Sequence, residues 1–490
     1  MTSTNKNESA NVVVFGATGD LSIRKLFPSL FQLFLNHSLA DDLRIVAVVR
    51  AELTVETFAQ RIAESCLKRT QDRSQFDAFV KKIDCVRMDI GNVETFAALR
   101  SMLSDTVRSI FYFSVSPSLY GAITAGLKQH GCINTDSRVV VEKPIGHNLE
   151  TATQISNELS KSFDESQIFR IDHYLGKETV QNIMALRFGN AVLEPLWCAE
   201  RIQSMQITVA EDIGVVNRGP YYDHTGALRD MVQNHLLQLL CVMAMEPPGQ
   251  LNPASVRDEK LKVLRSLRAI QPSDVVTKTV RGQYVASPDR KASKNYLQEV
   301  GVDPCSQTET FVAVKAEIDN WRWAGMPVYM RTGKELPSRA SEIVIQFKDV
   351  PHKLFKHTAS HLLANRLVIS LQPEESIKLY LNAKTPGRGM TLQPVALNLD
   401  LINSSPMRRW DAYERLILDV IQGDLTLFMR ETDVLAAWNW IDPIVQGWIE
   451  HMPNPEPYEA GTWGPVAADQ LLAKDGFIWH NPGRYINDMH

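Results

Sequence analysis

The stretch Asn11-Val12-Val13-Val14-Phe15-Gly16-Ala17-Thr18-Gly19-Asp20-Leu21 decides the fold of this chain. Its first five residues form an apolar, largely β-branched run, which predicts a buried strand. The glycines allow a tight turn, and apolar residues recur at helical spacing from about Ile23 to Asn36. Pro28 lies inside this helical pattern, so the helix is expected to be kinked or to begin late. A strand, a glycine-rich turn and a helix in this order are typical of a dinucleotide-binding unit.

The choice of dinucleotide is indicated by Arg50, which ends the next predicted strand at residues 44–49. NAD-binding domains usually place an acid there for the ribose 2′-hydroxyl, whereas an arginine fits the 2′-phosphate of NADP. The glycine spacing, Gly16-x-x-Gly19, is not the usual G-x-G-x-x-G. A βα turn without a ligand and a solvated arginine are therefore the alternatives, but the two features together favour NADP.

Further strands are predicted downstream, separated by segments long enough for crossover helices, at residues 84–88, 108–115, 138–142 and 167–169. This alternation predicts a doubly wound, Rossmann-like parallel sheet with a first domain at residues 1–187. Asp89-Ile90 and Glu142-Lys143-Pro144 end two of these strands, where ligands bind in open α/β sheets.

After Arg201 the pattern changes to alternation of apolar and polar residues. Such segments lie at residues 202–209, 308–318, 327–331, 342–348, 367–371 and 377–381. They predict a larger C-terminal domain, residues 188–490, built on a mostly antiparallel sheet. One strong helix is expected at residues 227–245, followed by Pro247-Pro248.

Bulk properties restrict the function. A length of 490 residues favours two domains. Fifty-two basic and 56 acidic residues give a net charge of −4, which does not favour nucleic acid or an anionic membrane as a partner. The six cysteines lack metal-ligand spacing, so we expect reduced thiols, a cytoplasmic location and no metal site. The polar N-terminus lacks an apolar signal core, and the apolar run at residues 236–245 is far shorter than the roughly 20 residues of a spanning helix.

Two stretches concentrate chemically active side chains. Arg170-Ile171-Asp172-His173-Tyr174-Leu175-Gly176-Lys177-Glu178 lies between a predicted strand and a predicted helix. A charged turn before a surface helix is the alternative interpretation. His235 falls on the apolar stripe of the helix at 227–245, where a histidine is more often a core residue than a catalyst. However, Asp230 and Asn234 add polar groups that a core does not need. A general base also needs an orienting carboxylate, for which Asp172 is the candidate if the domains meet there.

The sequence resembles the bacterial type of the glucose-6-phosphate dehydrogenase family over about residues 11–470. Several blocks carry the resemblance and follow the family's order: Gly16–Leu21, Glu142–Pro144, Arg170–Glu178, Arg229–His235, Asn320–Gly325, Arg331–Lys334 and Ala460–Pro465. The resemblance implies oxidation of glucose 6-phosphate at C1 to 6-phosphoglucono-1,5-lactone with hydride transfer to NADP, the first step of the oxidative pentose phosphate pathway.

Catalytic and binding roles are implied by the same match. His235 corresponds to the base that takes the C1 hydroxyl proton, and Asp172 to the carboxylate that orients it. The residues that correspond to substrate-binding positions are His173, Tyr174, Lys177, Glu211, Asp230, Lys334, Arg339, Lys143 and Lys25. Those that correspond to cofactor-binding positions are Gly16, Ala17, Thr18, Gly19, Asp20, Leu21, Arg50, Asp89, Ile90, Lys143 and Pro144.

The sequence departs from the family at two places. Arg339 stands where bacterial relatives often carry a second lysine, which keeps the charge and changes its geometry. Ser22-Ile23 stands where relatives often have alanine and a basic residue, which bears on how strictly the turn excludes NAD. An NAD-preferring dehydrogenase of another aldose phosphate and a non-catalytic NADP-sensing protein are the alternatives. A homodimer or tetramer is expected from the family.

Overall fold

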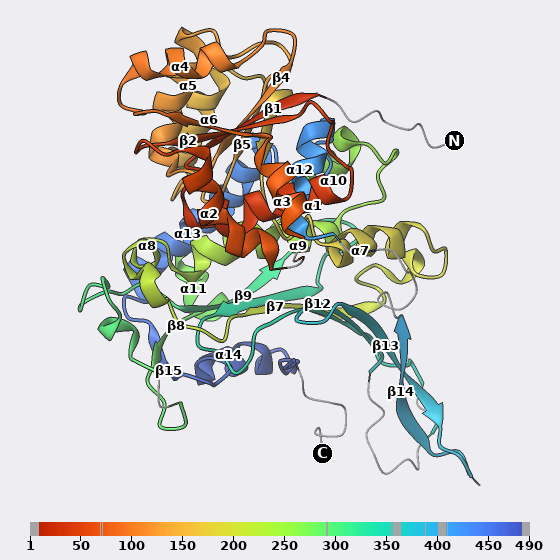
Figure 1. Ribbon diagram of the computed structural model, residues 1–490. Helices are drawn as coiled ribbons and strands as arrows, with labels where there is room; N and C mark the ends of the chain where they lie inside the picture. Colours follow the sequence, from red (N-terminus) through yellow and green to blue (C-terminus); the bar gives the residue numbers. More distant parts are fainter. Residues whose placement is uncertain are drawn as a thin grey trace. The chain divides into compact units, whose positions relative to one another are not determined.

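The computed structural model describes residues 9–68, 70, 72–290, 293–352, 354–355, 364–387, 389–399, 408 and 410–482. The chain divides into two compact units (Figure 1). The first comprises Met1–Glu178, Pro248–Asp258 and Arg409–Leu435, and the second Thr179–Pro247, Glu259–Arg408 and Ala436–His490. The predicted division into residues 1–187 and 188–490 is a division of the sequence, and it stays a prediction. It does not describe the compact units, because each of them is built from three separate segments.

The first unit contains a six-stranded sheet of order β3-β2-β1-β4-β5-β6 in which every neighbouring pair is parallel. Its strands are β1 (Ala10–Phe15), β2 (Arg44–Val49), β3 (Ile83–Arg87), β4 (Arg108–Phe113), β5 (Arg138–Val141) and β6 (Ile168–Arg170). Strand order reverses beside β1, as in doubly wound folds, and this confirms the predicted parallel sheet. The carboxyl ends of all six strands therefore lie along one edge.

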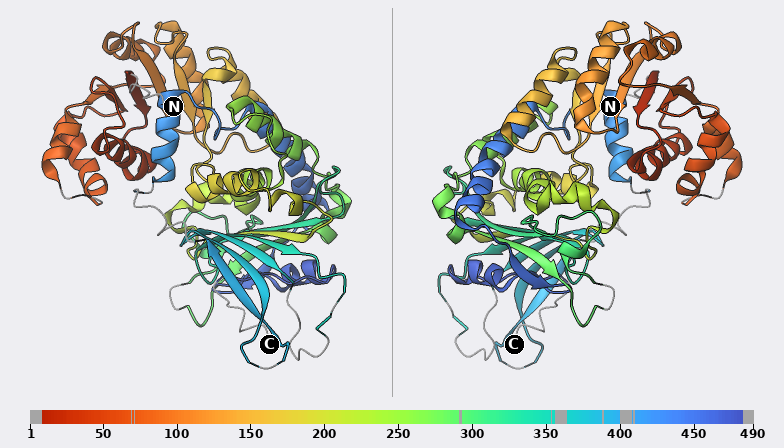
Figure 2. Two further views of the ribbon diagram at one scale, coloured as in Figure 1. Left: turned by 90° about the vertical axis from the view of Figure 1, so that its right-hand side faces the viewer. Right: turned by 90° about the vertical axis from the view of Figure 1, so that its left-hand side faces the viewer.

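Helices cover both faces of this sheet (Figure 2). They are α1 (Phe27–Leu35), α2 (Val55–Leu67), α3 (Arg73–Val80), α4 (Phe96–Met102), α5 (Tyr120–Gln129) and α6 (Leu149–Ser160). The first helical segment begins at Asp20, continues as a π-helix, η1 (Ser22–Leu26), and passes into α1 with Pro28 in its first turn. The helix therefore does not begin late, and the proline lies where α1 replaces the π-helical turn.

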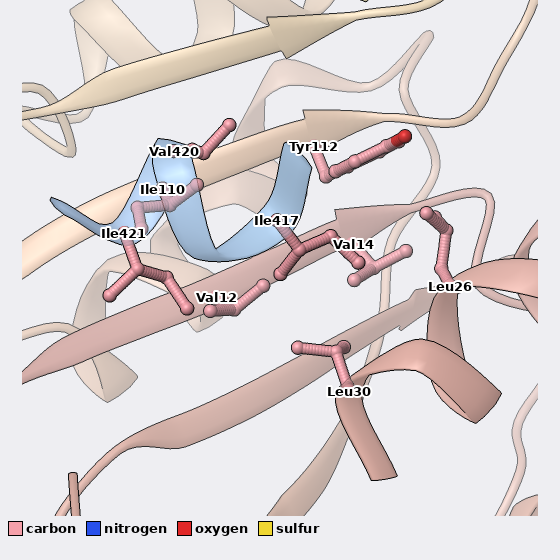
Figure 3. A pocket seen from close by; sticks show the side chains of 9 residues that line it. All are labelled: Val12, Val14, Leu26, Leu30, Ile110, Tyr112, Ile417, Val420 and Ile421. Carbon is pink, nitrogen blue, oxygen red and sulfur yellow. The ribbon is translucent and has the colours of Figure 1, made fainter. Parts of the chain in front are cut away.

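A helix from far along the chain completes the first unit. α12 (Ala412–Gln422) places Ile417, Val420 and Ile421 against β1, β4, η1 and α1, around a small apolar pocket (Figure 3). The remaining lining residues are Val12, Val14, Leu26, Leu30, Ile110 and Tyr112. Phe428 packs edge-on against Phe169 of β6, with ring centroids 4.9 Å apart. This packing holds α12 and the segment that follows it on the six-stranded sheet, a placement with no counterpart in the sequence pattern.

The second unit is organised by a nine-stranded sheet of order β14-β13-β12-β11-β7-β10-β9-β8-β15. Its strands are β7 (Ile202–Ala210), β8 (Thr279–Val285), β9 (Phe311–Glu317), β10 (Pro327–Gly333), β11 (Ala340–Phe347), β12 (Arg366–Gln372), β13 (Ser376–Lys384), β14 (Leu392–Leu399) and β15 (Glu456–Glu459). Most neighbouring pairs are antiparallel, as predicted, but β7 with β10 and β8 with β15 are parallel. The sheet is therefore mixed.

Helices of the second unit lie on both faces of this sheet, with α9 and α11 on one and α14 on the other (Figures 1 and 2). They are α7 (Glu178–Phe188), α8 (Gly219–Asp223), α9 (Leu237–Ala244), α11 (Val275–Lys278) and α14 (Val466–Ala473). α10 (Pro253–Arg265) and α13 (Glu431–His451) contribute residues to both units. Beneath α14, aromatic side chains such as Tyr284, Phe311 and Tyr458 form a continuous buried cluster. Among the described residues, no helix combines the length and apolarity needed to cross a bilayer.

The helix expected at residues 227–245 differs from its prediction in one respect. Its first half, η7 (Leu228–Leu236), is a π-helix, and only the second half, α9, is α-helical. The predicted helix is present, but its π-helical winding was not predicted, because the apolar spacing that buries this segment fits either winding. π-helical turns are uncommon and occur often at functional sites.

Candidate functional site

The glycine-rich turn after β1 requires glycine at position 16. Gly16 has φ of +76°, and a Cβ there would lie 2.3 Å from the Ser114 carbonyl oxygen. Only glycine accepts this backbone conformation at little cost and leaves room for the neighbouring strand end. The turn closes through a hydrogen bond from Gly19 N to Gly16 O (2.9 Å) and one from Ser22 Oγ to the same carbonyl (3.0 Å). The sequence Gly16–Leu21 thus forms a compact backbone cradle at the edge of the sheet.

The other predicted cofactor residues lie along the same edge. Arg50 follows β2 directly and is exposed, while Asp89 and Ile90 follow β3, the neighbouring strand. Asp89 Oδ1 accepts the Gly91 N–H at 3.0 Å, which fixes this turn. Lys25 is exposed in η1. The structure therefore brings the turn, the strand-end arginine and the acidic turn to adjacent strand ends, where a nucleotide could lie.

The end of β5 carries Glu142, Lys143 and a cis peptide bond to Pro144. Glu142 accepts a hydrogen bond from the Tyr112 hydroxyl at 2.5 Å and another from Tyr413. Burial raises the pKa of Glu142 to about 7, against the opposing effects of the Tyr112 hydrogen bond and of Lys143. A carboxyl group that is half-protonated near neutral pH thus lies at the strand end beside a candidate substrate lysine.

The stretch Arg170–Glu178 leaves the carboxyl end of β6 as a hydrogen-bonded turn. The Asp172 side chain is 1% exposed, and its Oδ1 accepts the Tyr174 N–H at 2.9 Å. Its main-chain oxygen accepts the Leu175 N–H at 3.1 Å. Lys177 is also buried, with Nζ 4.2 Å from the centre of the Tyr174 ring. The turn therefore fixes a carboxylate, a phenol and an ammonium group within one short segment, as the prediction required.

His173 contacts two aromatic rings of the first unit. Its ring centroid is 5.0 Å from that of Tyr174 and 6.2 Å from that of Tyr413, the latter ring being nearly parallel at 14°. Gly176 lies against the start of α12, because a Cβ there would come within 2.7 Å of the Ala412 carbonyl oxygen. The first turn of α12 thus supports the turn that carries the predicted phosphate-binding residues.

In the second unit, His235 and Asp230 are both buried in the π-helix η7. Hydrogen bonds in a π-helix join residues five apart, so this winding aligns position 230 with position 235. The Asn234 amide oxygen accepts the His235 N–H at 2.6 Å, and its amide nitrogen donates to the Arg229 carbonyl. The π-helix therefore places Asp230 and His235 closer to the same side of the helix than an α-helix would.

Glu211, Lys334 and Arg339 meet at one end of the large sheet. Glu211 follows β7 and Lys334 follows β10, and these strands are parallel with Ala210 opposite Gly333. Lys334 Nζ donates to Glu211 Oε2 at 2.6 Å. Arg339 is exposed and immediately precedes β11, which begins opposite Ala210. The register thus brings Glu211 to the sheet end that carries Lys334 and Arg339, two cations more than a hundred residues later in the sequence.

Tyr222 is a further residue of this cluster that sequence reasoning missed. Its buried ring lies 4.9 Å from Lys334 Nζ. Burial, with Asp230, Glu309 and Glu211 nearby, raises the pKa of its phenol well above the ordinary value. Tyr413 of the first unit was missed as well. Neither tyrosine has a local sequence signal, because each reaches its cluster only through tertiary packing.

The predicted residues therefore form two groups, one in each compact unit. Asp172, His173, Tyr174, Lys177, Lys143, Lys25 and all the cofactor candidates belong to the first unit. His235, Glu211, Asp230, Lys334 and Arg339 belong to the second. Each group combines buried carboxylates with cations, which suits a phosphorylated, hydroxyl-rich ligand and a proton transfer.

Comparison with known proteins matches nearly the whole chain to the two domains of one protein family. Residues 13–182 match the family model described as glucose-6-phosphate dehydrogenase, NAD binding domain, and residues 184–480 match its C-terminal domain. The chain is similar to glucose-6-phosphate 1-dehydrogenase of Rhizobium meliloti (strain 1021), with 46% identity over 97% of this chain and 98% of the relative. It is equally similar to the Mycolicibacterium smegmatis protein of the same name, with 46% identity over 96% and 98%.

A solved structure shows the same fold throughout. It is that of a glucose-6-phosphate dehydrogenase in complex with its substrate glucose-6-phosphate, and it superimposes with a TM-score of 0.90 at 34% identity. The alignment covers 98% of this chain and all of the other, so both sheets and the helices around them have counterparts there.

Proposed function

This chain belongs to the glucose-6-phosphate dehydrogenase family, and from that premise we propose that it oxidises glucose 6-phosphate at C1, with NADP as hydride acceptor. The product is 6-phosphoglucono-1,5-lactone. The observation that carries the proposal is the full-length similarity to an enzyme solved with that substrate, at a TM-score of 0.90. Both clusters of buried acids and cations described above support it, because they match the needs of a sugar phosphate.

His235 is the proposed general base. It takes the proton of the C1 hydroxyl through an imidazole nitrogen, while the hydride on C1 leaves and the C1–O bond becomes a carbonyl. The buried π-helix holds the imidazole away from bulk water. Asp172 is proposed to orient the imidazole and to stabilise the charged form that the proton transfer creates.

The substrate phosphate is proposed to bind His173, Tyr174 and Lys177. A dianion there would meet an ammonium group held over an aromatic ring and N–H groups at the start of α7. Glu211 and Asp230 are proposed acceptors for the sugar hydroxyls, and Lys334 and Arg339 are cations of the same cluster. Lys143 and Lys25 are proposed to contact the substrate side of the cofactor site.

NADP is the proposed cofactor, and its nicotinamide would accept the hydride. Glycine at position 16 lets the turn pack directly against Ser114, at the sheet edge where a dinucleotide is expected to bind. The residues proposed to hold it are Gly16–Leu21, Arg50, Asp89, Ile90, Lys143 and Pro144. Arg50 supports NADP over NAD because it is a fixed cation exposed at the end of β2.

A cytoplasmic location and a homodimer or tetramer complete the proposal. No disulfide joins the six cysteines, all of which lie in the described part of the chain, and this suits a reducing compartment. β14, the edge strand that pairs with β13, exposes Leu397 and Leu399 at one side of the large sheet. This exposed edge suits association with a second copy.

One assay tests the proposed reaction. The absorbance of reduced nicotinamide is followed with glucose 6-phosphate and either NADP or NAD, and with glucose or buffer in place of the sugar phosphate. We expect rapid reduction of NADP with glucose 6-phosphate alone. Absence of reduction with every cofactor would exclude the dehydrogenase function, and equal rates with glucose would exclude the phosphate site.

A further inference from the structure

Tyr413 lies in the first turn of helix α12 and is fixed in place by several independent contacts within the first unit. The Asp411 side chain accepts its backbone N–H at 3.0 Å and so begins the helix at this point. The Tyr413 ring is only 8% exposed. Its hydroxyl is hydrogen-bonded to Glu142, which raises the pKa of the phenol further after the larger effect of burial.

Glu142 extends this arrangement to the central sheet. The same carboxyl group accepts the Tyr112 hydroxyl from β4, and the Tyr120 hydroxyl donates to the Glu142 carbonyl at 3.3 Å. The Tyr413 hydroxyl is therefore tied to the ends of two adjacent strands. A phenol held at its hydroxyl and buried along its ring has little rotational freedom, so its ring plane is set by the sheet.

The fixed ring meets His173. The two rings are nearly parallel, 14° apart in plane, with centroids separated by 6.2 Å. The Tyr174 ring lies 5.0 Å from the imidazole, so His173 has two aromatic neighbours, one from its own turn and one from α12. Contacts of the ring face orient the imidazole, and its hydrogen-bonding nitrogens lie at the ring edge.

We propose that Tyr413 is a positioning residue that sets the orientation of His173 for the substrate phosphate, and that Glu142 holds Tyr413 in that role. The inference rests on the proposed function, because His173 is a proposed phosphate ligand. A partly exposed histidine on a turn would lose side-chain freedom when it binds a phosphate. An imidazole already held by an aromatic neighbour loses less, so the substrate binds more tightly.

The experiment compares Tyr413→Phe, Tyr413→Leu, His173→Ala and the double variant of the last two. KM for glucose 6-phosphate, kcat, KM for NADP and Tm are measured for each. Tyr413→Leu removes the ring, and we expect KM for glucose 6-phosphate to rise about three- to tenfold, in line with the strength of an aromatic pair. Tyr413→Phe keeps the ring and loses only the hydrogen bond, so a smaller rise is expected. KM for NADP should change less than twofold in both.

Tyr329→Phe is the matched control. It removes the hydrogen bond of another buried tyrosine hydroxyl to a carboxylate, that of Asp475, in the second unit and near the end of β10 that lies away from Lys334. A comparable loss of Tm without a change in KM for glucose 6-phosphate is expected from this variant. It separates general loss of stability from loss of substrate binding.

The double variant decides the mechanism. If Tyr413 acts through His173, Tyr413→Leu should raise KM no further in the His173→Ala background. Multiplicative effects of the two substitutions would overturn the inference, as would an unchanged KM in Tyr413→Leu while His173→Ala raises it. If His173→Ala itself leaves KM unchanged, the proposed phosphate site fails instead, and the two failures are thereby distinguished.

Discussion

Lys334 Nζ lies 2.6 Å from Glu211 Oε2, although the two residues are far apart in sequence. The pair exists because β7 and β10 are parallel neighbours whose carboxyl ends coincide. Lys334 is nearly buried and Glu211 is about one-third exposed. The ammonium group is therefore held at the sheet end by its neighbour before any substrate arrives.

The first prediction concerns this pair. Lys334→Met should lower kcat/KM for glucose 6-phosphate by roughly ten- to hundredfold, the effect of losing a charge-assisted hydrogen bond. Glu211→Gln should act in the same direction, and the double variant should lose less than the product of the two effects. Steady-state kinetics provide the measurement.

Lys315→Met is the control, since Lys315 makes a similar pair with Asp475 at 2.6 Å outside the candidate site. A loss in Lys315→Met as large as that in Lys334→Met would show that the effect is not specific to the site.

Cofactor choice depends on Arg50 in the second prediction. Arg50→Ala should weaken NADP by about ten- to hundredfold and NAD much less, because only NADP carries the 2′-phosphate. Arg44→Ala, at the other end of the same strand and paired with Asp84, should leave both affinities unchanged. Equal weakening of the two cofactors by Arg50→Ala would contradict the 2′-phosphate assignment.

Proton transfer is the subject of the third prediction. His235→Asn should reduce kcat by about 10²- to 10⁴-fold, the usual contribution of a general base. Asp172→Asn should lose much of the same factor through misorientation of the imidazole. Binding of glucose 6-phosphate, followed by calorimetry, should change little in His235→Asn. Near-normal turnover in that variant would return His235 to the role of a buried core residue.

Discrimination between glucose 6-phosphate and glucose gives the fourth prediction. Lys177→Ala should lower kcat/KM for the phosphorylated sugar by at least tenfold and that for free glucose far less, because only the former carries the dianion. Part of the phosphate binding energy positions C1, so kcat should fall together with affinity. Lys161→Ala, an exposed lysine paired with Glu158, is the control. A ratio between the two sugars that Lys177→Ala leaves unchanged would exclude Lys177 as a phosphate ligand.

The fifth prediction links stability to pH through Glu142. The pKa of its carboxyl group is 4.5 ordinarily and about 7 in the folded protein, chiefly through burial. Between these values the folded state holds a proton that the unfolded state has released, so rising pH favours unfolding. The Tm of Glu142→Gln minus that of the wild type should therefore increase from pH 5 to pH 8.

Measurement of Tm across this range, with exposed Glu52→Gln as the control, checks the sign. A difference in Tm between Glu142→Gln and the wild type that stays constant from pH 5 to pH 8 would show that the pKa of the Glu142 carboxyl group is not raised by folding.

The sequence predicted the strands of the first unit well because each is a buried apolar run bounded by turn residues. β2 was predicted with its bounds, and β6 differs by one residue. Three strands of the second unit were missed: β8, β14 and β15. β14 contains Pro394 and is largely exposed, and β15 has only four residues, so neither shows a clear alternation.

The candidate site was predictable where a short motif carries it and unpredictable where packing assembles it. Asp172 and Lys177 share one segment, so the sequence alone places them together. By contrast, Tyr413 reaches His173 only because α12 packs on β1 and β4, and Tyr222 reaches Lys334 only through the fold of the second unit. The π-helical winding at His235 was missed because apolar periodicity does not distinguish it from an α-helix.

The return of α12 to the nucleotide-binding sheet has a consequence for biosynthesis. A ribosome delivers β1 near the start of translation, but the helix that covers Val12 and Ile110 is delivered only after residue 422 has been added. Until then the apolar surface of β1 and β4 stays exposed to chaperones, and a nascent chain arrested at residue 187 has no segment to cover it. Completion of the nucleotide-binding unit therefore awaits most of the second unit, so this chain cannot finish its folding in strict order from the N-terminus.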